Sequence, residues 1–276
     1  MVAGMRTAVV TGAGSGLGRA ISAELAGRGY RVHVTDLDPS AADRTMAETG
    51  AASASGLDVR DESECRALAG SLASGGCLDL WVNNAGVFFS GPAWEQSRAT
   101  RQKMLDVNAV GVMNGTVAAL EPMIAAGRGH VVNVVSLAGI VAPPGEVAYA
   151  ASKHAALAFT LGTLFDLRRA GVRGVRLSAV CPDGIWTPML HDKLDDPDAA
   201  LSFSGELLRP ERVARAIGDL TEHPRPILVV PRWRGPVVRA FSLFPRLGLR
   251  LLPLLVWDAR RRQRRYKRLI EAGDWP

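Results

Sequence analysis

The stretch RTAVVTGAGSGLGRAISAELAGRGY, residues 6–30, decides the fold of this chain. Its first six residues are mostly β-branched and predict a short strand, and its last part carries apolar residues at a helical period. Between them lies the glycine-rich turn GAGSGLG. A strand, such a turn and a helix, in this order, form the site at which α/β proteins bind the diphosphate of a dinucleotide, because the first amides of the helix are free. The stretch therefore predicts an α/β protein that binds a dinucleotide.

The residues of this turn have separate expected roles. Gly12 permits the tight turn, Gly16 lets the backbone approach the diphosphate, and Gly18 lets the helix pack closely on its strand. Ser15 and Leu17 lie between these glycines and are expected to line the cofactor. A glycine-rich turn without a ligand is the alternative, but the strand before it and the helix after it favour a dinucleotide site.

The second expected strand, RVHVTDLD (residues 31–38), carries an acidic residue near its end. Asp36 follows Gly18 by eighteen residues, where a carboxylate accepts hydrogen bonds from the ribose hydroxyls of NAD and repels the 2′-phosphate of NADP. The residue before Gly16 is Ser15, so no arginine there neutralises such a phosphate. We expect NAD rather than NADP.

The rest of the chain alternates between the two kinds of element. Strands are expected at residues 53–59, 78–86, 129–136, 175–181 and 226–231, and helices at 62–73, 98–126, 149–167 and 210–222. Seven strands that alternate with helices indicate a doubly wound parallel sheet with helices on both faces. No internal repeat or linker is visible, so we expect one catalytic domain at 1–231 and a C-terminal extension at 232–276.

The stretch SLAGIVAPPGEVAYAASK, residues 136–153, holds the candidate catalytic groups. Tyr149 and Lys153 are four residues apart, so they leave the same face of a helix, and Ser136 ends the preceding strand. A free tyrosine has a pKa of about 10. A nearby lysine cation lowers that pKa and makes the phenol a usable general acid/base, while Ser136 offers a hydrogen bond to a carbonyl or hydroxyl group. An accidental helix pair is the alternative.

Together these motifs resemble the classical short-chain dehydrogenase/reductase family. The matching segments are residues 11–18, Asp58-Val59, Asn83-Asn84-Ala85-Gly86, Asn108, Ser136, and Tyr149 with Lys153. They occur in the family's order and spacing over residues 6–231. The resemblance implies a Rossmann-like fold and hydride transfer between a nicotinamide cofactor and an alcohol or carbonyl compound.

The resemblance also implies a role for each matching residue. Tyr149 is the acid/base, Ser136 orients the substrate oxygen, Lys153 binds the nicotinamide ribose and lowers the tyrosine pKa, and Asn108 holds a water that relays protons. The implied cofactor contacts are Asp58 and Val59 at the adenine, Asn83, Ala85 and Gly86 along the cofactor, and Pro182, Ile185 and Thr187 at the nicotinamide.

One position departs from the family pattern. Asp183 stands where the family usually has glycine after Pro182, although Thr187 keeps its spacing from that proline. Two interpretations remain open: Asp183 has a structural role in this loop, or it contacts the substrate.

The residues expected around the substrate are apolar. They are Phe88, Phe89, Trp94, Val141, Val147, Trp186, Met189 and Leu190, and residues 188–209 resemble the family's variable substrate loop. Such a lining favours a hydrophobic secondary alcohol or ketone, for example a steroid-, terpenoid- or retinoid-like molecule. Two alternatives remain: the aromatic residues face the core or another subunit, or the protein is a non-catalytic NAD-binding sensor with the same fold.

The C-terminal extension is strongly basic. Residues 232–268 contain twelve Arg or Lys and one acid, a net charge of +11 in a chain of net +6, so the rest carries −5. Residues 237–257 are long enough to span a bilayer, but the two central arginines cost about 5–7 kcal/mol, which cancels the apolar gain. Pro245 and Pro253 are expected to break the segment into two short helices, with Arg239, Arg246 and Arg250 on one stripe.

Three interpretations of the extension remain open. A basic amphipathic segment suits the surface of an anionic membrane. Its apolar face also suits packing on the protein body or on a second subunit. Nonspecific nucleic-acid binding is the third, although no recognition motif accompanies the basic run, so no specific nucleic-acid partner is expected.

Composition and length set the remaining expectations. Three cysteines and five scattered histidines have neither disulfide-framework nor metal-ligand spacing, so no metal is expected. The chain reaches its first strand almost at once, which leaves no room for a signal peptide and favours the cytoplasm, with peripheral membrane contact left open. The family resemblance implies a homodimer or homotetramer built from helices 98–126 and 149–167, where small residues would permit close approach.

Overall fold

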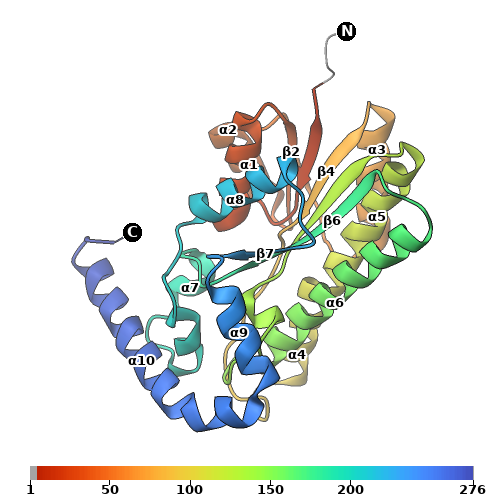
Figure 1. The fold of residues 1–276 in the computed structure, drawn as a ribbon. Coiled ribbons are helices and arrows are strands. Elements are labelled where there is room, and N and C mark those ends of the chain that lie inside the picture. Colours follow the sequence, from red (N-terminus) through yellow and green to blue (C-terminus); the bar gives the residue numbers. More distant parts are fainter. Residues whose placement is uncertain (1–4, 276) are drawn as a thin grey trace.

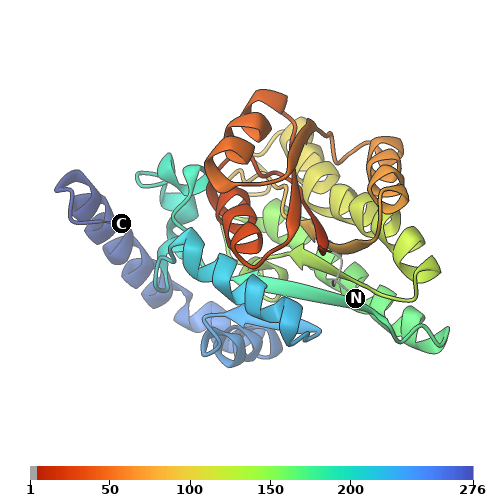
Figure 2. The same ribbon diagram turned by 90° about the horizontal axis from the view of Figure 1, so that it is seen from above.

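The computed structural model describes residues 5–275. Its centre is a seven-stranded parallel sheet in the order β3-β2-β1-β4-β5-β6-β7, with helices on both faces (Figures 1 and 2). The strands are β1 (Thr7–Val10), β2 (Arg31–Asp36), β3 (Ser53–Gly56), β4 (Leu78–Asn83), β5 (Gly129–Val134), β6 (Val175–Pro182) and β7 (Ile227–Val230). The predicted doubly wound, Rossmann-like sheet is confirmed.

The strand order places the site. From β1 the chain first builds β2 and β3 on one side and then β4 to β7 on the other, so the order reverses between β1 and β4. Ligands of open α/β sheets bind beyond the carboxyl ends of the strands at such a reversal. The loops that follow β1, β4 and β5 meet there, and they carry the glycine-rich turn, Asn84 and Ser136.

Ten α-helices are described. They are α1 (Gly16–Gly27), α2 (Pro39–Thr49), α3 (Glu62–Ser74), α4 (Arg98–Leu105), α5 (Gly111–Ala125), α6 (Val147–Arg169), α7 (Pro188–His191), α8 (Pro210–Glu222), α9 (Arg234–Leu243) and α10 (Pro245–Glu271). The predicted helix 98–126 consists of α4, a π-helical turn over Asp106–Val110, and α5. Single π-turns inside helices often mark functional positions, and this one contains Asn108.

The core lies on both faces of the sheet. On one face α1 and α8 bury Ile21, Leu25 and Ile217, and on the other Trp81 and Met123 lie fully buried under α3, α5 and α6. Because parallel strands are covered on both sides, they consist of nearly continuous apolar runs such as TAVV in β1. Each large apolar side chain buried in this way stabilises the fold by about 1.5–3 kcal/mol.

The small residues of α5 pack on the body of the same chain. A Cβ atom on Gly115 would lie 2.1 Å from Asn83 Oδ1, and one on Gly111 would lie 2.6 Å from Val59 Cγ2. Ala118 is also buried. The prediction that these residues permit close approach of a second subunit is therefore wrong for α5, because the helix uses them to approach its own sheet.

The C-terminal extension forms two helices joined at an elbow. Figure 1 shows α9 running away from the sheet. The chain turns at the end of α9, and α10 then runs outward to the C-terminus. Pro245 begins α10, but Pro253 lies inside it. The predicted break at Pro253 is wrong: the helix continues and forgoes the hydrogen bond that this proline cannot donate.

Candidate active site

A cavity of about 1090 Å³ lies beyond the carboxyl ends of the strands. We call the part lined by the loops after β1, β2 and β4 the cofactor half, and the part between α6, residues 183–209 and the C-terminal extension the substrate half. A site for one drug-sized ligand is usually about 300–1,000 Å³. The volume here therefore suits a cavity shared by a cofactor and a second ligand.

The cofactor half has the backbone geometry that a diphosphate needs. Gly12 and Gly16 adopt positive φ angles of 60° and 51°. A Cβ atom on Gly12 would lie 2.6 Å from Ala85 Cα, and one on Gly18 would lie 2.3 Å from Gly12 O. Ser15 precedes α1 without capping it through its side chain, so the first amides of the helix remain open to a ligand. Leu17 and Gly86 also line the cavity.

Asp36 and Asp58 line the cofactor half at its adenosine end, together with Val59. Asp36 Oδ2 accepts a 2.9 Å hydrogen bond from Gly14 N, which fixes the carboxylate at the end of β2. The guanidinium of Arg60 is hydrogen-bonded to both oxygens of Asp58 and lowers the pKa of that carboxyl group. Of the two carboxylates, Asp36 is the one without an arginine partner among the described residues.

Asn83 is not in the cofactor half, contrary to the expectation from the family resemblance. Its Oδ1 accepts a 2.7 Å hydrogen bond from Trp81 Nε1, and its Nδ2 donates a 2.8 Å hydrogen bond to Asn133 Oδ1 in the core. Asn84 lines the cavity instead, and its Nδ2 donates to Thr11 O and Gly12 O at 3.0 Å. Asn83 is the last residue of β4 and its side chain is buried in the core, whereas Asn84 begins the loop that follows the strand.

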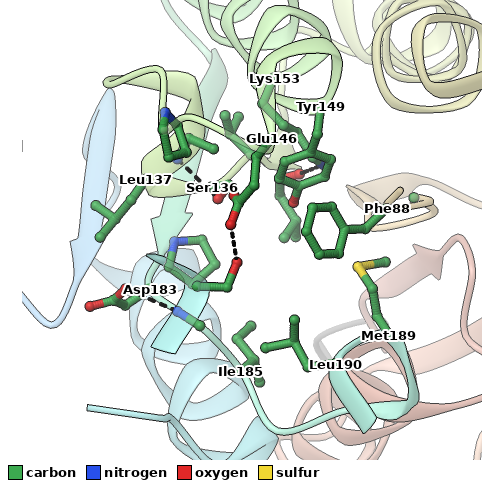
Figure 3. Close-up of a pocket in the computed structure, with 18 of the residues that line it drawn as sticks. Phe88, Ser136, Leu137, Glu146, Tyr149, Lys153, Asp183, Ile185, Met189 and Leu190 are labelled. Carbon is green, nitrogen blue, oxygen red and sulfur yellow. Dashed lines mark hydrogen bonds between the residues drawn. The ribbon is translucent and has the colours of Figure 1, made fainter. Parts of the chain in front are cut away.

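Tyr149, Ser136 and Lys153 line one wall of the cavity (Figure 3). The Tyr149 ring packs edge-on against Phe88 with 4.9 Å between the ring centroids. Ser136 follows β5, and its Oγ accepts a 3.1 Å hydrogen bond from Ala138 N. Lys153 is 4% exposed and its Nζ donates a 3.0 Å hydrogen bond to Val134 O. The three predicted groups therefore meet where the two halves join.

The pKa of Tyr149 differs from the sequence-based expectation. Burial raises the pKa of the phenol, the Glu146 carboxyl raises it further, and the interaction with Ser136 acts in the opposite direction. Lys153 Nζ donates its hydrogen bond to Val134 O and lies 5.8 Å from the tyrosine ring centroid. Burial lowers the pKa of Lys153 to about 8. Tyr149 is therefore protonated at neutral pH, which is the form that donates a proton to a substrate oxygen.

Asn108 lies behind the cavity wall and does not line the cavity. Its Oδ1 accepts from Val87 N at 2.8 Å, and its Nδ2 donates to Val87 O and to Ser152 Oγ at 2.9 and 3.1 Å. A Cβ atom on Gly86 would lie 3.2 Å from Asn108 Oδ1 and 3.7 Å from Lys153 Nζ. Asn108 is thus close to Lys153, and its side chain holds the backbone of the neighbouring loop.

The predicted substrate residues divide into two groups. Phe88, Val141, Met189 and Leu190 line the cavity, as do the predicted nicotinamide contacts Pro182, Ile185 and Thr187. Trp94, Val147, Trp186 and Phe89 do not. Trp94 is 84% exposed on the loop before α4, and Val147 is also exposed at the start of α6. Trp186 packs on the His191 ring at 4.2 Å and on a buried cluster around Phe203, so it supports the loop instead.

Comparison with known proteins establishes the family. Residues 6–198 match the family described as short chain dehydrogenase. This chain belongs to the short-chain dehydrogenase family. It is 36% identical over 202 residues to 2-(R)-hydroxypropyl-CoM dehydrogenase of Xanthobacter autotrophicus. The matched segment covers 70% of this chain and 80% of that relative. It is 33% identical over 222 residues to cyclopentanol dehydrogenase of Comamonas testosteroni, covering 77% and 88%.

Solved structures share the fold of this dehydrogenase. A short chain dehydrogenase/reductase from Burkholderia phymatum in complex with NAD superposes with a TM-score of 0.78 at 29% identity, covering 88% of this chain and 95% of that one. Levodione reductase gives a TM-score of 0.72 at 27% identity, covering 81% and 95%. The chain is thus a member of an oxidoreductase family, and residues 199–276 lie beyond the segment that the family description matches.

The C-terminal extension of this dehydrogenase forms the outer wall of the substrate half. The cavity-lining residues from α9 and α10 are Arg234, Val237, Val238, Phe241, Ser242, Pro245, Gly248, Leu249, Leu252, Leu255 and Asp258. Ser242 Oγ donates a 2.5 Å hydrogen bond to Ile140 O, and Gln263 Nε2 donates to Lys193 O and Asp196 O at 2.7 and 2.8 Å. The inner face of the extension therefore packs on its own body, which was one of the three interpretations of this segment.

Asp183 has a structural partner in the same extension. Its Oδ2 lies 2.7 Å from Arg234 Nε on α9, and the pair is almost fully buried. The N–H direction is not aligned with the carboxylate oxygen, so the contact is an ion pair more than a hydrogen bond. Asp183 Oδ1 also accepts from Gly184 N at 3.0 Å. Asp183, which replaces the glycine usual in the family, thus pairs with Arg234, and this ion pair links the extension to the loop after β6.

Glu146 is a cavity residue that the sequence analysis missed. It precedes α6, is 3% exposed, and extends into the substrate half (Figure 3). Burial raises the pKa of its carboxyl group to about 8. Its position three residues before Tyr149 was visible in the sequence, but a glutamate at the start of a helix usually faces solvent, so nothing in the sequence marked it as buried.

Proposed function

We propose that this dehydrogenase is an NAD-dependent oxidoreductase that interconverts a hydrophobic secondary alcohol and its ketone. The observation that carries the proposal is the shared wall on which Tyr149, Ser136 and Lys153 lie between the diphosphate cradle and an apolar pocket. Two relatives, a 2-(R)-hydroxypropyl-CoM dehydrogenase and a cyclopentanol dehydrogenase, are named for secondary alcohols, which supports this reaction class.

In the reductive direction the nicotinamide cofactor supplies a hydride to the carbonyl carbon. Tyr149, protonated because of its burial, donates its phenolic proton to the carbonyl oxygen. Ser136 binds the same oxygen and orients it. Lys153, held by Val134 O, places a positive charge beside the tyrosine and stabilises the phenolate left by the proton transfer. In the oxidative direction the same groups act in reverse.

The choice of NAD is supported by Asp36. Its carboxylate is fixed by Gly14 N at the end of β2, where it accepts hydrogen bonds from ribose hydroxyls and repels a 2′-phosphate. A neighbouring structure, that of the Burkholderia phymatum protein, is in complex with NAD.

The lining of the substrate half supports a hydrophobic substrate. Phe88, Val141, Leu190, Phe241 and Leu252 contribute apolar surface from five separate segments. A steroid-, terpenoid- or retinoid-like alcohol or ketone suits a pocket of this size and composition.

The test is NADH fluorescence across a panel of lipophilic secondary alcohols and ketones. We expect turnover with NAD(H) for several members of the panel and little with NADP(H). Tight NAD binding without turnover of any member would favour the alternative, a non-catalytic NAD-binding sensor. The complete set of Tyr149, Ser136 and Lys153 argues against that alternative, because a sensor does not need an acid/base beside the nicotinamide.

We also propose a homodimer or homotetramer that uses the outer faces of α4, α5 and α6. Exposed apolar side chains gather there, at Leu105, Val117, Ile124 and Phe165. Phe165→Glu should reduce the oligomer mass measured by light scattering, because a carboxylate in an apolar contact is desolvated without a partner. Trp94→Glu is the matched control, since this aromatic residue is exposed elsewhere. A monomeric wild-type protein would contradict the proposal.

The outer face of the extension supports a further partner, the surface of an anionic membrane. Exposed apolar residues on the elbow and the first half of α10 are Leu243, Phe244, Leu247, Leu249, Leu254 and Trp257. Arg246 and Arg250 lie among them, and like charges oppose pairing of two such faces. No helix in the described residues is long and apolar enough to cross a membrane. We propose peripheral contact of a cytoplasmic enzyme, and the three free thiols fit that reducing compartment.

The membrane contact is tested by flotation with vesicles. Binding should occur with phosphatidylglycerol vesicles, fall with added salt because surface charges are screened over about 8–10 Å, and be lost in a Leu247→Asp, Leu254→Asp double variant. Equal binding to phosphatidylcholine vesicles, or no binding at low salt, would contradict it. A change of oligomer mass in the double variant would show that the same face binds a second copy instead.

A further inference from the structure

The carboxyl group of Glu146 has no catalytic or capping task. It is the N-cap residue of α6, but its side chain caps none of the helix amides. It lines the substrate half, and Figure 3 shows it extending toward the middle of the cavity beside Ser136 and Tyr149. Ser202 Oγ donates a 2.7 Å hydrogen bond to Glu146 Oε1. The described residues offer this carboxyl group no cation within ion-pair distance, since Arg234 is paired with Asp183.

Burying a carboxyl group without a cation is costly, so the group stays protonated. Burial is the main reason that its pKa rises to about 8, and the nearby Asp183 and Asp196 carboxyls add to it. The hydrogen bond with Ser202 Oγ engages Oε1, and a proton on Oε2 would be available to a ligand. A protonated carboxyl group of this kind is a hydrogen-bond donor. A neutral amide would hold Ser202 equally well, so the acid is not explained by that contact alone.

Apolar side chains share the cavity with Glu146. Val141, Leu201 and Phe88 are among the lining residues. A polar group among apolar walls fixes the orientation of a ligand, because an unpaired donor beside a bound hydrocarbon costs about 1–3 kcal/mol. Glu146 lies three residues before Tyr149, a spacing at which side chains are near neighbours.

We propose that Glu146 binds a second oxygen atom of the substrate, a carbonyl or ether oxygen a few bonds from the reacting carbon. This proposal rests on the proposed function and makes it narrower. The substrate class is then a lipophilic ketone or secondary alcohol with one further oxygen acceptor, not a simple hydrocarbon alcohol. The reacting oxygen meets Tyr149 and Ser136, and the second oxygen meets Glu146.

The test compares two isosteric ketones, propylcyclohexanone and methoxymethylcyclohexanone, each as its ring isomers. The second replaces one methylene group by an ether oxygen. For at least one isomer, wild type should reduce the ether with a kcat/KM about tenfold higher, the effect of one neutral hydrogen bond. In Glu146→Leu the ratio of kcat/KM for the ether to kcat/KM for the hydrocarbon should fall to about one. In Glu146→Gln, whose amide group can donate a hydrogen bond, most of the preference for the ether should remain. NAD affinity of each variant reports intact folding.

A second readout does not depend on turnover. In the NAD-loaded Tyr149→Phe variant, the ether should raise the melting temperature more than its hydrocarbon isostere does, and Glu146→Leu in that background should remove the difference. A ratio near one for all isomers in wild type would overturn the proposal, as would a stronger preference for an aminomethyl analogue. If NADH is not oxidised with any ketone while the melting shift persists, the proposed function fails and the second-oxygen site stands.

The ratio also has a pH dependence. The ionisable groups around Glu146 are Tyr149 and Lys153 on α6, Asp183 after β6, Asp196 before residues 197–203, and Arg234 on α9. Above pH 8 the Glu146 carboxyl group loses its proton and can no longer donate a hydrogen bond, so the preference for the ether should decline. Titration of Lys153 or Tyr149 changes both rates alike and leaves the ratio unchanged. A ratio that is constant to pH 10 would contradict protonated Glu146 as the donor.

Discussion

The cofactor half of the cavity is lined by loops from the first third of the chain, whereas the substrate half combines segments from its middle and its end. In the cofactor half, glycines and backbone amides after β1 meet loops that follow β2 and β4. In the substrate half, residues before α6 meet the loop after β6 and the two C-terminal helices. The first arrangement depends on backbone geometry at fixed spacing. The second depends on which side chains happen to meet, and spacing does not reveal that.

The largest expected effect concerns the wall between the two halves. Tyr149→Phe removes the acid/base and keeps the ring that packs on Phe88. We expect kcat to fall by about 100-fold or more, while the dissociation constant of NAD stays within about twofold, because general acid/base catalysis contributes this much to the rate. Steady-state kinetics and NADH fluorescence titration measure the two quantities. Retained turnover would contradict the assignment of Tyr149.

Ion pairing in the substrate half gives the next effect. Asp183→Ala leaves Arg234 buried without a partner and should lower the free energy of unfolding by about 3 kcal/mol. Asp183→Ala combined with Arg234→Met removes both charges and should recover most of that loss. Urea denaturation measures each variant. If the double variant is as unstable as the single one, the ion pair is not what ties the extension to the body.

A smaller effect is expected from a substitution in the cofactor half. Asp36→Ala removes an acceptor for the ribose hydroxyls and the charge that repels a 2′-phosphate. NAD affinity should weaken by about 30-fold, the equivalent of two hydrogen bonds, and NADP should gain relative to NAD. Fluorescence titration with both cofactors checks this. A wild type that already prefers NADP would contradict the role of Asp36.

These two regions also differ in what the sequence predicts. The strand–turn–helix order of residues 6–30 and the spacing of Asp36 were sufficient to place the cofactor half, because a tight turn admits few residue types. The choice between Asn83 and Asn84 was wrong, since it depends on which face the last strand residue of β4 presents. Both lie in one polar run, and only the observed register separates them.

The substrate half was harder to predict for physical reasons. Trp94, Val147 and Trp186 are apolar and were expected near the substrate, yet each leaves its backbone in a direction that sequence does not encode. The sequence of the extension showed its charge and its apolar residues clearly, but it did not show which face of each helix packs on the body. Asp183 and Arg234 are 51 residues apart, and neither predicts the other without the fold.

Two residues on α10 test directly whether the C-terminal extension forms a wall of the substrate half. Leu252 lines the cavity and Leu254 is 66% exposed on the outer side of the same helix. With a hydrophobic ketone and no vesicles, Leu252→Asp should raise KM enough to lower kcat/KM about tenfold, because a carboxylate in an apolar pocket costs at least about 1.4 kcal/mol. Leu254→Asp should leave kcat/KM within about twofold. Equal effects of the two substitutions, or none from Leu252→Asp, would contradict the claim.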